Sequence, residues 1–278
     1  MANEISFESV LPKAICLPLV RIERDPFLRK ELAAYCDEQT VQKAVEECPA
    51  AAGISKEVVN KIAKACITYE TRKVSALSFA AGIPGGLAML GTVPADLVQY
   101  MGHVLRVLQK LAYLYGWQDL LDDIKAGDEK MSDETSNILT LFVGVMFGVN
   151  GANTAIRKIS EGAARYASKT LMQKALTKGT IYPIVKKIAS MISVQMTKEI
   201  FSKGVSKIIP VVGGVVSGSL TYATFRPMSE RLRVHLATLK WANVDYYKEA
   251  EAPNSSPDSM VNIEVKDVVE VESVLDTE

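Results

Sequence analysis

A chain of 278 residues is long enough to bury a substantial core, in one large domain or two modest ones. Its 32 basic residues balance 32 acidic ones, so the composition argues against a dedicated nucleic-acid binder, and we expect no nucleic-acid partner. Hydrophobic residues make up 48% of the chain and the mean hydropathy is +0.11, which brings a membrane or partner surface into consideration.

The first segment, residues 1–54, is predicted to contain a leader and one helix. Its acidic start lacks the features of a secretory signal, so we expect a cytoplasmic protein. An apolar run between Pro12 and Pro18 predicts an irregular leader that lies against the body. Asp25 before Pro26 then predicts the start of a helix, with Asp25 as its cap.

The four cysteines indicate neither a redox motif nor a metal site. None of them forms a C-x-x-C pair, and no histidine cluster lies near them in the sequence. We therefore expect reduced thiols on or near apolar faces, with no metal and no cofactor. The residues are Cys16, Cys36, Cys48 and Cys66.

The second segment, residues 55–248, has the pattern of an all-α domain. Ser55 can cap a helix whose apolar residues recur at helical spacing. Another helix is predicted from Pro94 to Tyr115, because Gly116 stands where helices commonly end. The third segment, residues 249–278, opens with linker composition and is predicted to be a disordered acidic tail, although its apolar and polar alternation could add a strand to a partner's sheet.

Three long stretches of the chain carry no charge and are rich in glycine and other small residues. They are Val74 to Ala95, Thr135 to Ile156, and Ile208 to Phe225. Each contains two glycines four positions apart, which at helical pitch share a face and allow a second helix to approach closely. The pairs are Gly82 and Gly86, Gly144 and Gly148, and Gly214 and Gly218. We expect buried helical hairpins inside a compact domain, because the prolines in these stretches free backbone groups that lipid cannot satisfy. Entry into a bilayer is the alternative.

The segment from Ile156 to Lys207 is strongly basic. This segment contains eleven basic residues and two acidic ones, which gives it a net charge of +9. We predict a pair of basic amphipathic helices that attract anionic lipid headgroups or an acidic partner. The alternative is a set of solvated helix faces. The docking candidates are Lys169, Lys174, Lys178, Lys186, Lys187 and Lys198.

Asp96, Tyr100 and His103 are the candidates for chemistry. Their offsets place them on one side of the helix after Pro94, where a carboxylate could orient an imidazole as a base. The competing interpretation is structural, with Asp96 capping the helix and His103 a satisfied neighbour. The Gly85-Gly86 and Gly213-Gly214 pairs lack the spacing and the basic residue of a phosphate loop, so nucleotide binding is not expected.

Several motifs recur in an order that resembles the EcsC family of bacterial proteins, over about Val59 to Leu239. They are Val93-Pro94-Ala95-Asp96-Leu97, then Leu111-Ala112-Tyr113-Leu114-Tyr115-Gly116, then Ile209-Pro210-Val211-Val212-Gly213-Gly214, followed by Arg226 and Arg231. The resemblance implies a helical, cytoplasmic or peripheral membrane protein. It supplies no established catalytic residues, and the tail after Lys248 lies outside the family pattern.

Two hypotheses for function follow from the sequence. The first is a non-enzymatic helical accessory protein whose basic face docks on the inner face of the cell membrane or on a membrane protein. The second is an enzyme or carrier that binds a lipid or other apolar ligand in a glycine-lined interior, with Asp96, Tyr100 and His103 at its mouth.

Overall fold

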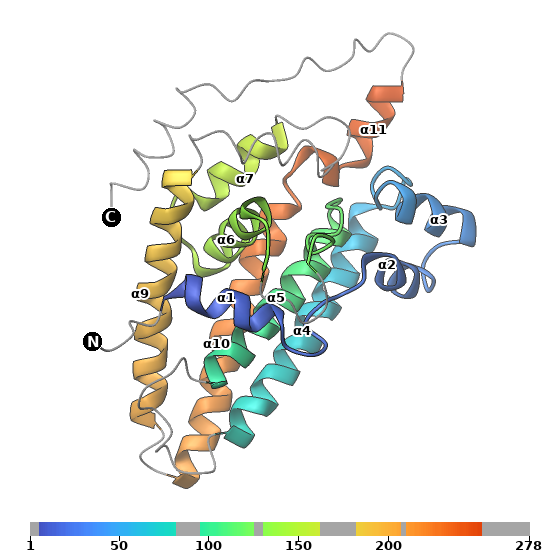
Figure 1. Ribbon diagram of the computed structural model, residues 1–278. Coiled ribbons are helices and arrows are strands. Elements are labelled where there is room, and N and C mark those ends of the chain that lie inside the picture. Colours follow the sequence, from blue (N-terminus) through green and yellow to red (C-terminus); the bar gives the residue numbers. More distant parts are fainter. Residues whose placement is uncertain (1–5, 82–94, 125–129, 162–181, 207–209, 252–278) are drawn as a thin grey trace.

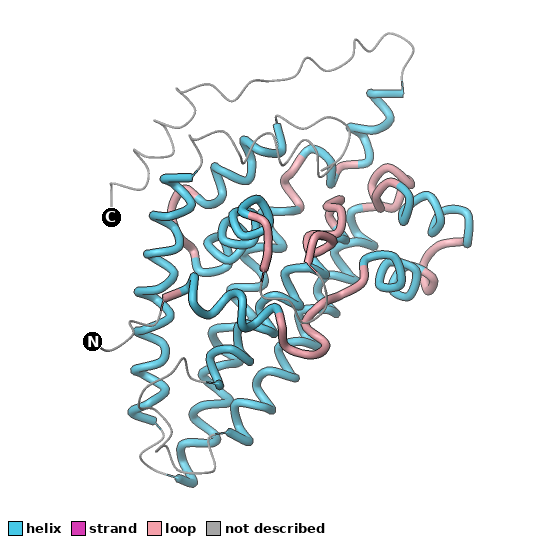
Figure 2. The backbone as a smooth tube through the Cα atoms, in the orientation of Figure 1, coloured by secondary structure: helices cyan, strands magenta, loops and turns pink. Residues whose placement is uncertain are grey.

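The computed structural model describes residues 6–81, 95–124, 130–161, 182–206 and 210–251. Every regular element in these ranges is a helix, which confirms the predicted all-α class (Figures 1 and 2). The helices are α1 (Phe7–Ile15), α2 (Arg24–Leu32), α3 (Glu38–Glu46), α4 (Lys56–Ala81), α5 (Ala95–Leu114), α6 (Asp133–Phe147), α7 (Ala152–Glu161), α9 (Tyr182–Ser206), α10 (Pro210–Leu236), the short 3₁₀ helix η1 (Lys240–Ala242) and α11 (Val244–Glu251).

Long helices form a bundle, and the shorter helices cover its sides and upper end (Figure 1). Helix α10 packs along α4 over most of its length and also contacts α5, α6 and α9. Helix α1 lies across α5 and reaches α9 at the outer edge of the bundle. Within the described ranges, none of the helices combines the length and hydropathy required of a transmembrane span.

Helix α6 forms the centre of the core. It arises from the charge-free stretch that begins at Thr135, and all its residues from Asn137 to Phe147 are buried. The helix ends at Gly148, whose φ of 72° is the left-handed conformation that glycine adopts without steric cost. The part of this charge-free stretch from Asn137 to Phe147 is therefore covered by protein on all sides.

The N-terminal leader is more regular than predicted. Residues Phe7–Ile15 form helix α1 because Ser6 and Ser9 make a reciprocal capping box, and Phe7, Leu11 and Ala14 place apolar side chains on one buried face. The amide of Phe7 also donates to Ser193 Oγ on α9 at 2.8 Å. The leader is thus an integral part of the core, despite Pro12 inside the helix.

The helix predicted to begin at Pro26 begins at Arg24 instead, with Glu23 at the cap position and no side-chain cap. Arg24 is buried, and its guanidinium donates to the backbone carbonyls of Val45, Glu47 and Trp117. A buried guanidinium needs such partners, because its donors cannot be left without acceptors. Arg24 thereby joins the end of α3 to the chain that follows α5.

One long helix, α10, contains most of the third charge-free stretch together with the basic residues that follow it. Helix α10 runs without interruption through Pro227, and it ends at Leu236. Proline removes one backbone donor, but the buried side chains of Phe225, Met228 and Leu232 hold the helix against its neighbours. The last described helix, α11, extends to Glu251, just past the predicted start of the tail at residue 249.

Candidate functional site

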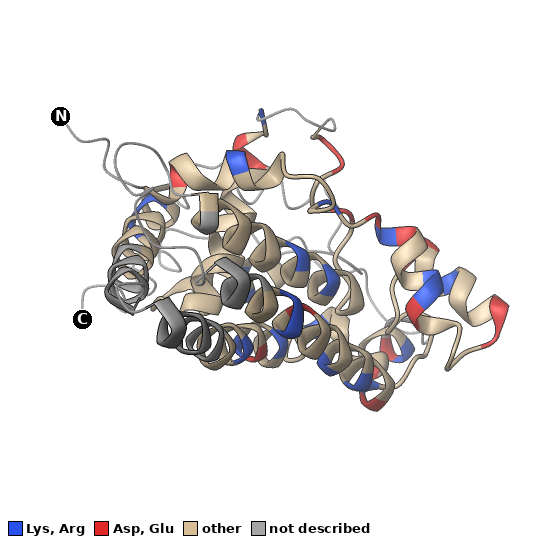
Figure 3. Cartoon of the chain, turned by 90° about the horizontal axis from the view of Figure 1, so that it is seen from below, with Lys and Arg blue, Asp and Glu red and all other residues tan. Residues whose placement is uncertain are grey.

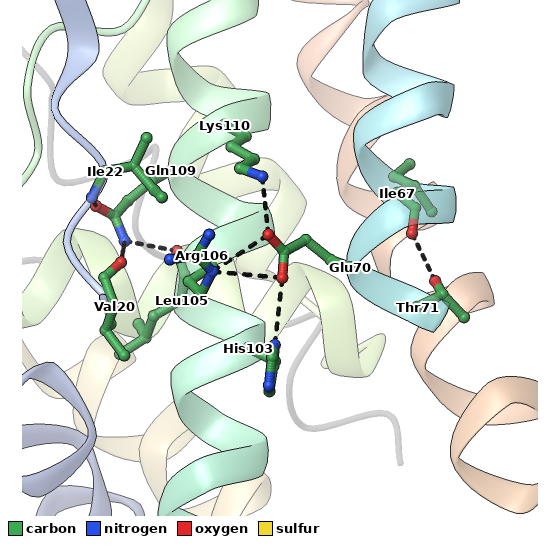
Figure 4. Close-up of polar contacts among 10 residues, drawn as sticks. All are labelled: Val20, Ile22, Ile67, Glu70, Thr71, His103, Leu105, Arg106, Gln109 and Lys110. Carbon is green, nitrogen blue, oxygen red and sulfur yellow. Dashed lines mark hydrogen bonds and ion pairs between the residues drawn. The ribbon is translucent and has the colours of Figure 1, made fainter. Parts of the chain in front are cut away.

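The most unusual polar group among the described residues is a carboxylate in the interface between α4 and α5. Glu70 of α4 is fully buried, and three basic side chains of α5 surround it (Figure 4). Lys110 Nζ lies 2.8 Å from Glu70 Oε1, Arg106 Nε lies 3.2 Å from the same oxygen, and His103 Nδ1 lies 3.2 Å from Oε2. Positions 103, 106 and 110 share one face of α5 because they are three and four residues apart.

The surroundings of Glu70 decide its protonation. Burial raises the pKa of this carboxyl, but hydrogen bonds from His103 and Lys110, together with the charges of Lys110 and Arg106, outweigh burial and lower the pKa to about 2. Glu70 is therefore ionised at every physiological pH. Because Arg106 and Lys110 carry two positive charges against one negative charge, the cluster is positive even with neutral His103.

The basic side of the cluster continues to the protein surface. The ammonium of Lys110 also lies 5.1 Å from the ring centroid of Tyr69, and Lys73 lies 5.5 Å from the same ring. Tyr69 is 53% exposed, and Lys73 is exposed beside it on α4. A buried carboxylate thus anchors a patch of lysine and tyrosine at the surface of α4.

A carboxylate next to an imidazole can orient the ring as a general base. In this cluster Arg106 donates to both carboxylate oxygens and Lys110 donates to Oε1, so Glu70 does not serve the imidazole alone. The geometry is that of an ionic contact that fixes α5 against α4. Pairing of this kind compensates the cost of burying each charge.

The structure separates the predicted candidates for chemistry. Tyr100 is buried and turned toward α10, where its hydroxyl lies 3.5 Å from Met228 Sδ and its ring stands edge-on to Phe225. His103 contacts α4 through Glu70. Asp96 begins α5, but its side chain lies outside the described residues. The two described members therefore contact different helices.

Glu70 was not among the residues predicted from the sequence, although the sequence contains a signal for it. The buried positions of α4 recur at helical spacing through Ile62, Cys66, Ile67 and Val74, and Glu70 falls on the same stripe. An acidic residue on an apolar stripe needs a partner, because an unpaired charge is very costly to bury. The sequence does not identify the partner.

The predicted docking lysines are only partly within the described residues. Lys186 is exposed on α9 and Lys187 is partly exposed. Lys198 belongs to α9, but its side chain lies outside the description, as do the three remaining candidates. Those are Lys169, Lys174 and Lys178.

The three glycine pairs were predicted to lie at close contacts between helices, and the structure describes the surroundings of only one pair. At Gly144 an added Cβ would lie 2.7 Å from Ile188 Cγ2, so α6 and α9 approach closely there. Gly148 does not share this packing face, because it is the left-handed end of α6 and faces Arg231. Gly82 and Gly86 lie outside the described residues. Gly214 and Gly218 belong to α10, but their surroundings are likewise not described.

A depression of about 420 Å³ lies between α1 and the start of α6. Its lining mixes apolar groups with Glu8, Lys130 and Asp133, and it contains no glycine. This depression is therefore not the glycine-lined interior that the carrier hypothesis requires. Among the described residues, no group of three or more His, Cys, Asp and Glu side chains could hold a metal ion.

The described site is thus an ion cluster with a basic surface edge. No protein-family model, curated protein or solved structure matches the chain. The resemblance to the EcsC family accordingly stays a prediction from the sequence motifs.

Proposed function

We propose that this protein is a non-enzymatic, helical accessory factor that docks reversibly on an anionic membrane surface, such as the inner face of the cell membrane. The observation that supports this proposal best is the outer face of α9. Tyr182 is 59% exposed and Val194 is 52% exposed, and exposed Lys186 lies between them. Tyr182 and Lys186 are four positions apart and share one side of the helix, and Val194 lies about 120° further round its exposed surface.

A helix that exposes tyrosine, valine and lysine suits the boundary between water and lipid. The aromatic and aliphatic groups can enter the headgroup region while the ammonium group pairs with lipid phosphate. Helix α9 lies at the outer edge of the bundle, where this surface is accessible (Figure 1). The sequence from Ile156 to Lys207, which contains α9, has a net charge of +9.

Electrostatic docking of this kind does not need a transmembrane segment. Each Lys or Arg near an anionic surface contributes about 1 kcal/mol, so several together hold a protein reversibly. Salt weakens the attraction because mobile ions screen exposed charges. We therefore expect binding to vesicles that contain phosphatidylglycerol, weak binding to pure phosphatidylcholine, and release at high salt.

The test is cosedimentation of the full-length protein with vesicles of equal parts phosphatidylcholine and phosphatidylglycerol. Lys186→Glu changes the local charge by two and should weaken binding by about tenfold. Lys64→Glu, an equally exposed lysine on α4, is the matched control for net charge. Equal binding by wild type and Lys186→Glu would exclude α9 as the docking face, and absence of vesicle binding would exclude the proposed function itself.

A further inference from the structure

The exposed face of α4 from Lys61 to Lys73 carries four basic side chains, the other two being those of Lys64 and Arg72. The acidic residue of this stretch, Glu70, is buried and paired with basic side chains of α5. In the view from below, basic positions recur along the long helices of the bundle (Figure 3). Among the described residues, no carboxylate forms an ion pair with any of the four exposed basic groups of this face.

Two exposed tyrosines accompany the charges of this face. Lys61 Nζ lies 5.1 Å from the centroid of the Tyr35 ring, and Lys73 Nζ lies 5.5 Å from that of Tyr69. Tyr35 is 43% exposed, and Tyr69 is exposed as well. Ala65 is exposed one turn from Lys61 and one turn from Tyr69, so apolar surface separates the charges. A partner that fits this face must therefore combine acidic groups with apolar side chains.

The sequence after α11 has this complementary composition. Residues 252–278, which we call the acidic tail, contain seven acidic residues and one basic residue, a net charge of −6. In an extended chain, successive side chains point to opposite sides. The odd-numbered positions of the tail include Val261, Ile263 and Val265, and the even-numbered positions include Glu264, Glu270 and Glu272. The tail sequence can therefore present apolar groups on one side and carboxylates on the other.

The hydrogen bond between Cys48 and Tyr247 places the start of the acidic tail near α4. Tyr247 belongs to α11, the helix that ends at Glu251 directly before the tail. Cys48 lies in the segment that joins α3 to α4. Figure 1 shows the same relationship, because α11 and the beginning of α4 both lie in the upper right part of the molecule. The tail therefore begins at the end of α4 that is nearer to Lys61.

The chain is long enough for the acidic tail to reach this face. Nine residues separate Glu251 from Val261, and in an extended conformation they span about 30 Å. From Lys61 to Lys73 the helix rises by about 18 Å. A tether of this length gives the segment that follows it a local concentration in the millimolar range. Exposed ion pairs, each of them weak, are then sufficient to hold the tail in place.

We propose that the exposed face of α4 from Lys61 to Lys73 binds the acidic tail of the same chain. The tail carboxylates pair with the lysines and with Arg72, while the valine and isoleucine side chains contact Ala65 and the ring of Tyr69. Salt weakens this contact, because mobile ions screen the exposed charges on both sides. The inference does not depend on the docking of α9 on a membrane.

Carbodiimide cross-linking of the full-length protein tests this contact, because the reagent joins a carboxylate to an ammonium group only where the two groups meet. Mass spectrometry identifies the joined peptides. We expect tail carboxylates to couple to the lysines of the α4 face about five times as often as to Lys13 of α1 and Lys186 of α9, which are exposed elsewhere. At high salt this preference should disappear.

Arg72→Glu separates charge attraction from mere proximity. Carbodiimide does not couple carboxylates to arginine, so this variant reverses one charge of the face and leaves every lysine target in place. Coupling of the tail to Lys61 and Lys64 should fall about threefold. Arg29→Glu is the matched control, because Arg29 is an exposed arginine of α2 that donates to Gln42 of α3. Coupling in this control should equal that in wild type.

Three results would overturn the proposal. If the tail couples to the α4 lysines no more often than to Lys13 and Lys186, or not at all, the tail does not bind this face. If Arg72→Glu couples as well as wild type, the charge of α4 does not hold the tail. In a mixture of isotopically labelled and unlabelled protein, links that join only different chains would show that the face binds a second copy and not its own tail.

Discussion

The thiol of Cys48 donates a hydrogen bond to the hydroxyl of Tyr247, 3.2 Å away, although 199 positions separate the two residues. The hydroxyl of Tyr247 in turn donates to the backbone carbonyl of Trp241 at 3.1 Å. Burial raises the pKa of the Cys48 thiol, so the sulfur keeps the proton that it donates. This chain of hydrogen bonds fastens α11 to the segment after α3.

Replacing Tyr247 with Phe tests this connection. The substitution keeps the ring but leaves the buried thiol of Cys48 and the carbonyl of Trp241 without their partner, so the free energy of unfolding should fall by about 1–2 kcal/mol. Urea denaturation measures the change. The neighbouring Tyr246→Phe is the control, and an equal loss in both variants would show that the hydrogen bonds contribute nothing specific.

The ion cluster gives a second prediction. Glu70→Gln keeps the size of the side chain but leaves Arg106 and Lys110 buried without a counter-charge, so stability at neutral pH should fall by about 3–5 kcal/mol. The same replacement at Glu57, an exposed residue of α4, should have little effect. A loss at Glu70 no larger than that at Glu57 would show that the cluster does not hold the two helices together.

Acid should weaken the same cluster in a defined range. The pKa of Glu70 is about 2 in the folded protein against an ordinary value of 4.5, so the unfolded chain binds a proton at higher pH than the folded chain. The stabilisation is complete above pH 4.5 and is lost as the pH falls toward 2, by about 3 kcal/mol in total. Unfolding measured across this range should show a smaller loss for Glu70→Gln than for wild type.

His235 should dominate the pH dependence in a higher range. Burial, together with the positive charge of Arg157, lowers its pKa from 6.5 to about 4. As the pH falls from 6.5 toward 4, His235 binds a proton in the unfolded chain but stays unprotonated in the folded chain. The free energy of unfolding therefore decreases. In His235→Gln the denaturation midpoint should change less with pH across this range. If the midpoint changes with pH as much as in wild type, His235 is not the group responsible.

The close approach of α6 and α9 at Gly144 can be tested by adding one methyl group. The new Cβ in Gly144→Ala would lie 2.7 Å from Ile188 Cγ2, so the two helices must move apart, at a cost of about 1–3 kcal/mol. Combining it with Ile188→Ala should recover part of this loss, because the smaller side chain makes room. Thermal unfolding of the single and double variants measures the coupling, and purely additive losses would show that the two side chains do not compete for space.

Local sequence patterns were sufficient to predict helix ends that depend only on neighbouring residues. Ser55 was predicted to cap the helix that follows it, and its hydroxyl accepts a hydrogen bond from the amide of Val58. Gly116, predicted to follow the end of a helix, has a φ of 94° just beyond α5. The prediction for the residues of α1 was less accurate, because packing against distant helices outweighs the effect of Pro12.

The sequence by itself determined that the chain is helical, that its charges are unevenly distributed, and that three stretches avoid charge, since periodicity and composition are local properties. Only the tertiary structure distinguished these stretches, because burial depends on which helices meet. In the structure, α6 buries the stretch from Asn137 to Phe147, and the end of α4 and the beginning of α10 lie at the same end of the bundle. It also brought Glu70 to His103, Arg106 and Lys110, a contact between residues more than thirty positions apart that no local pattern specifies.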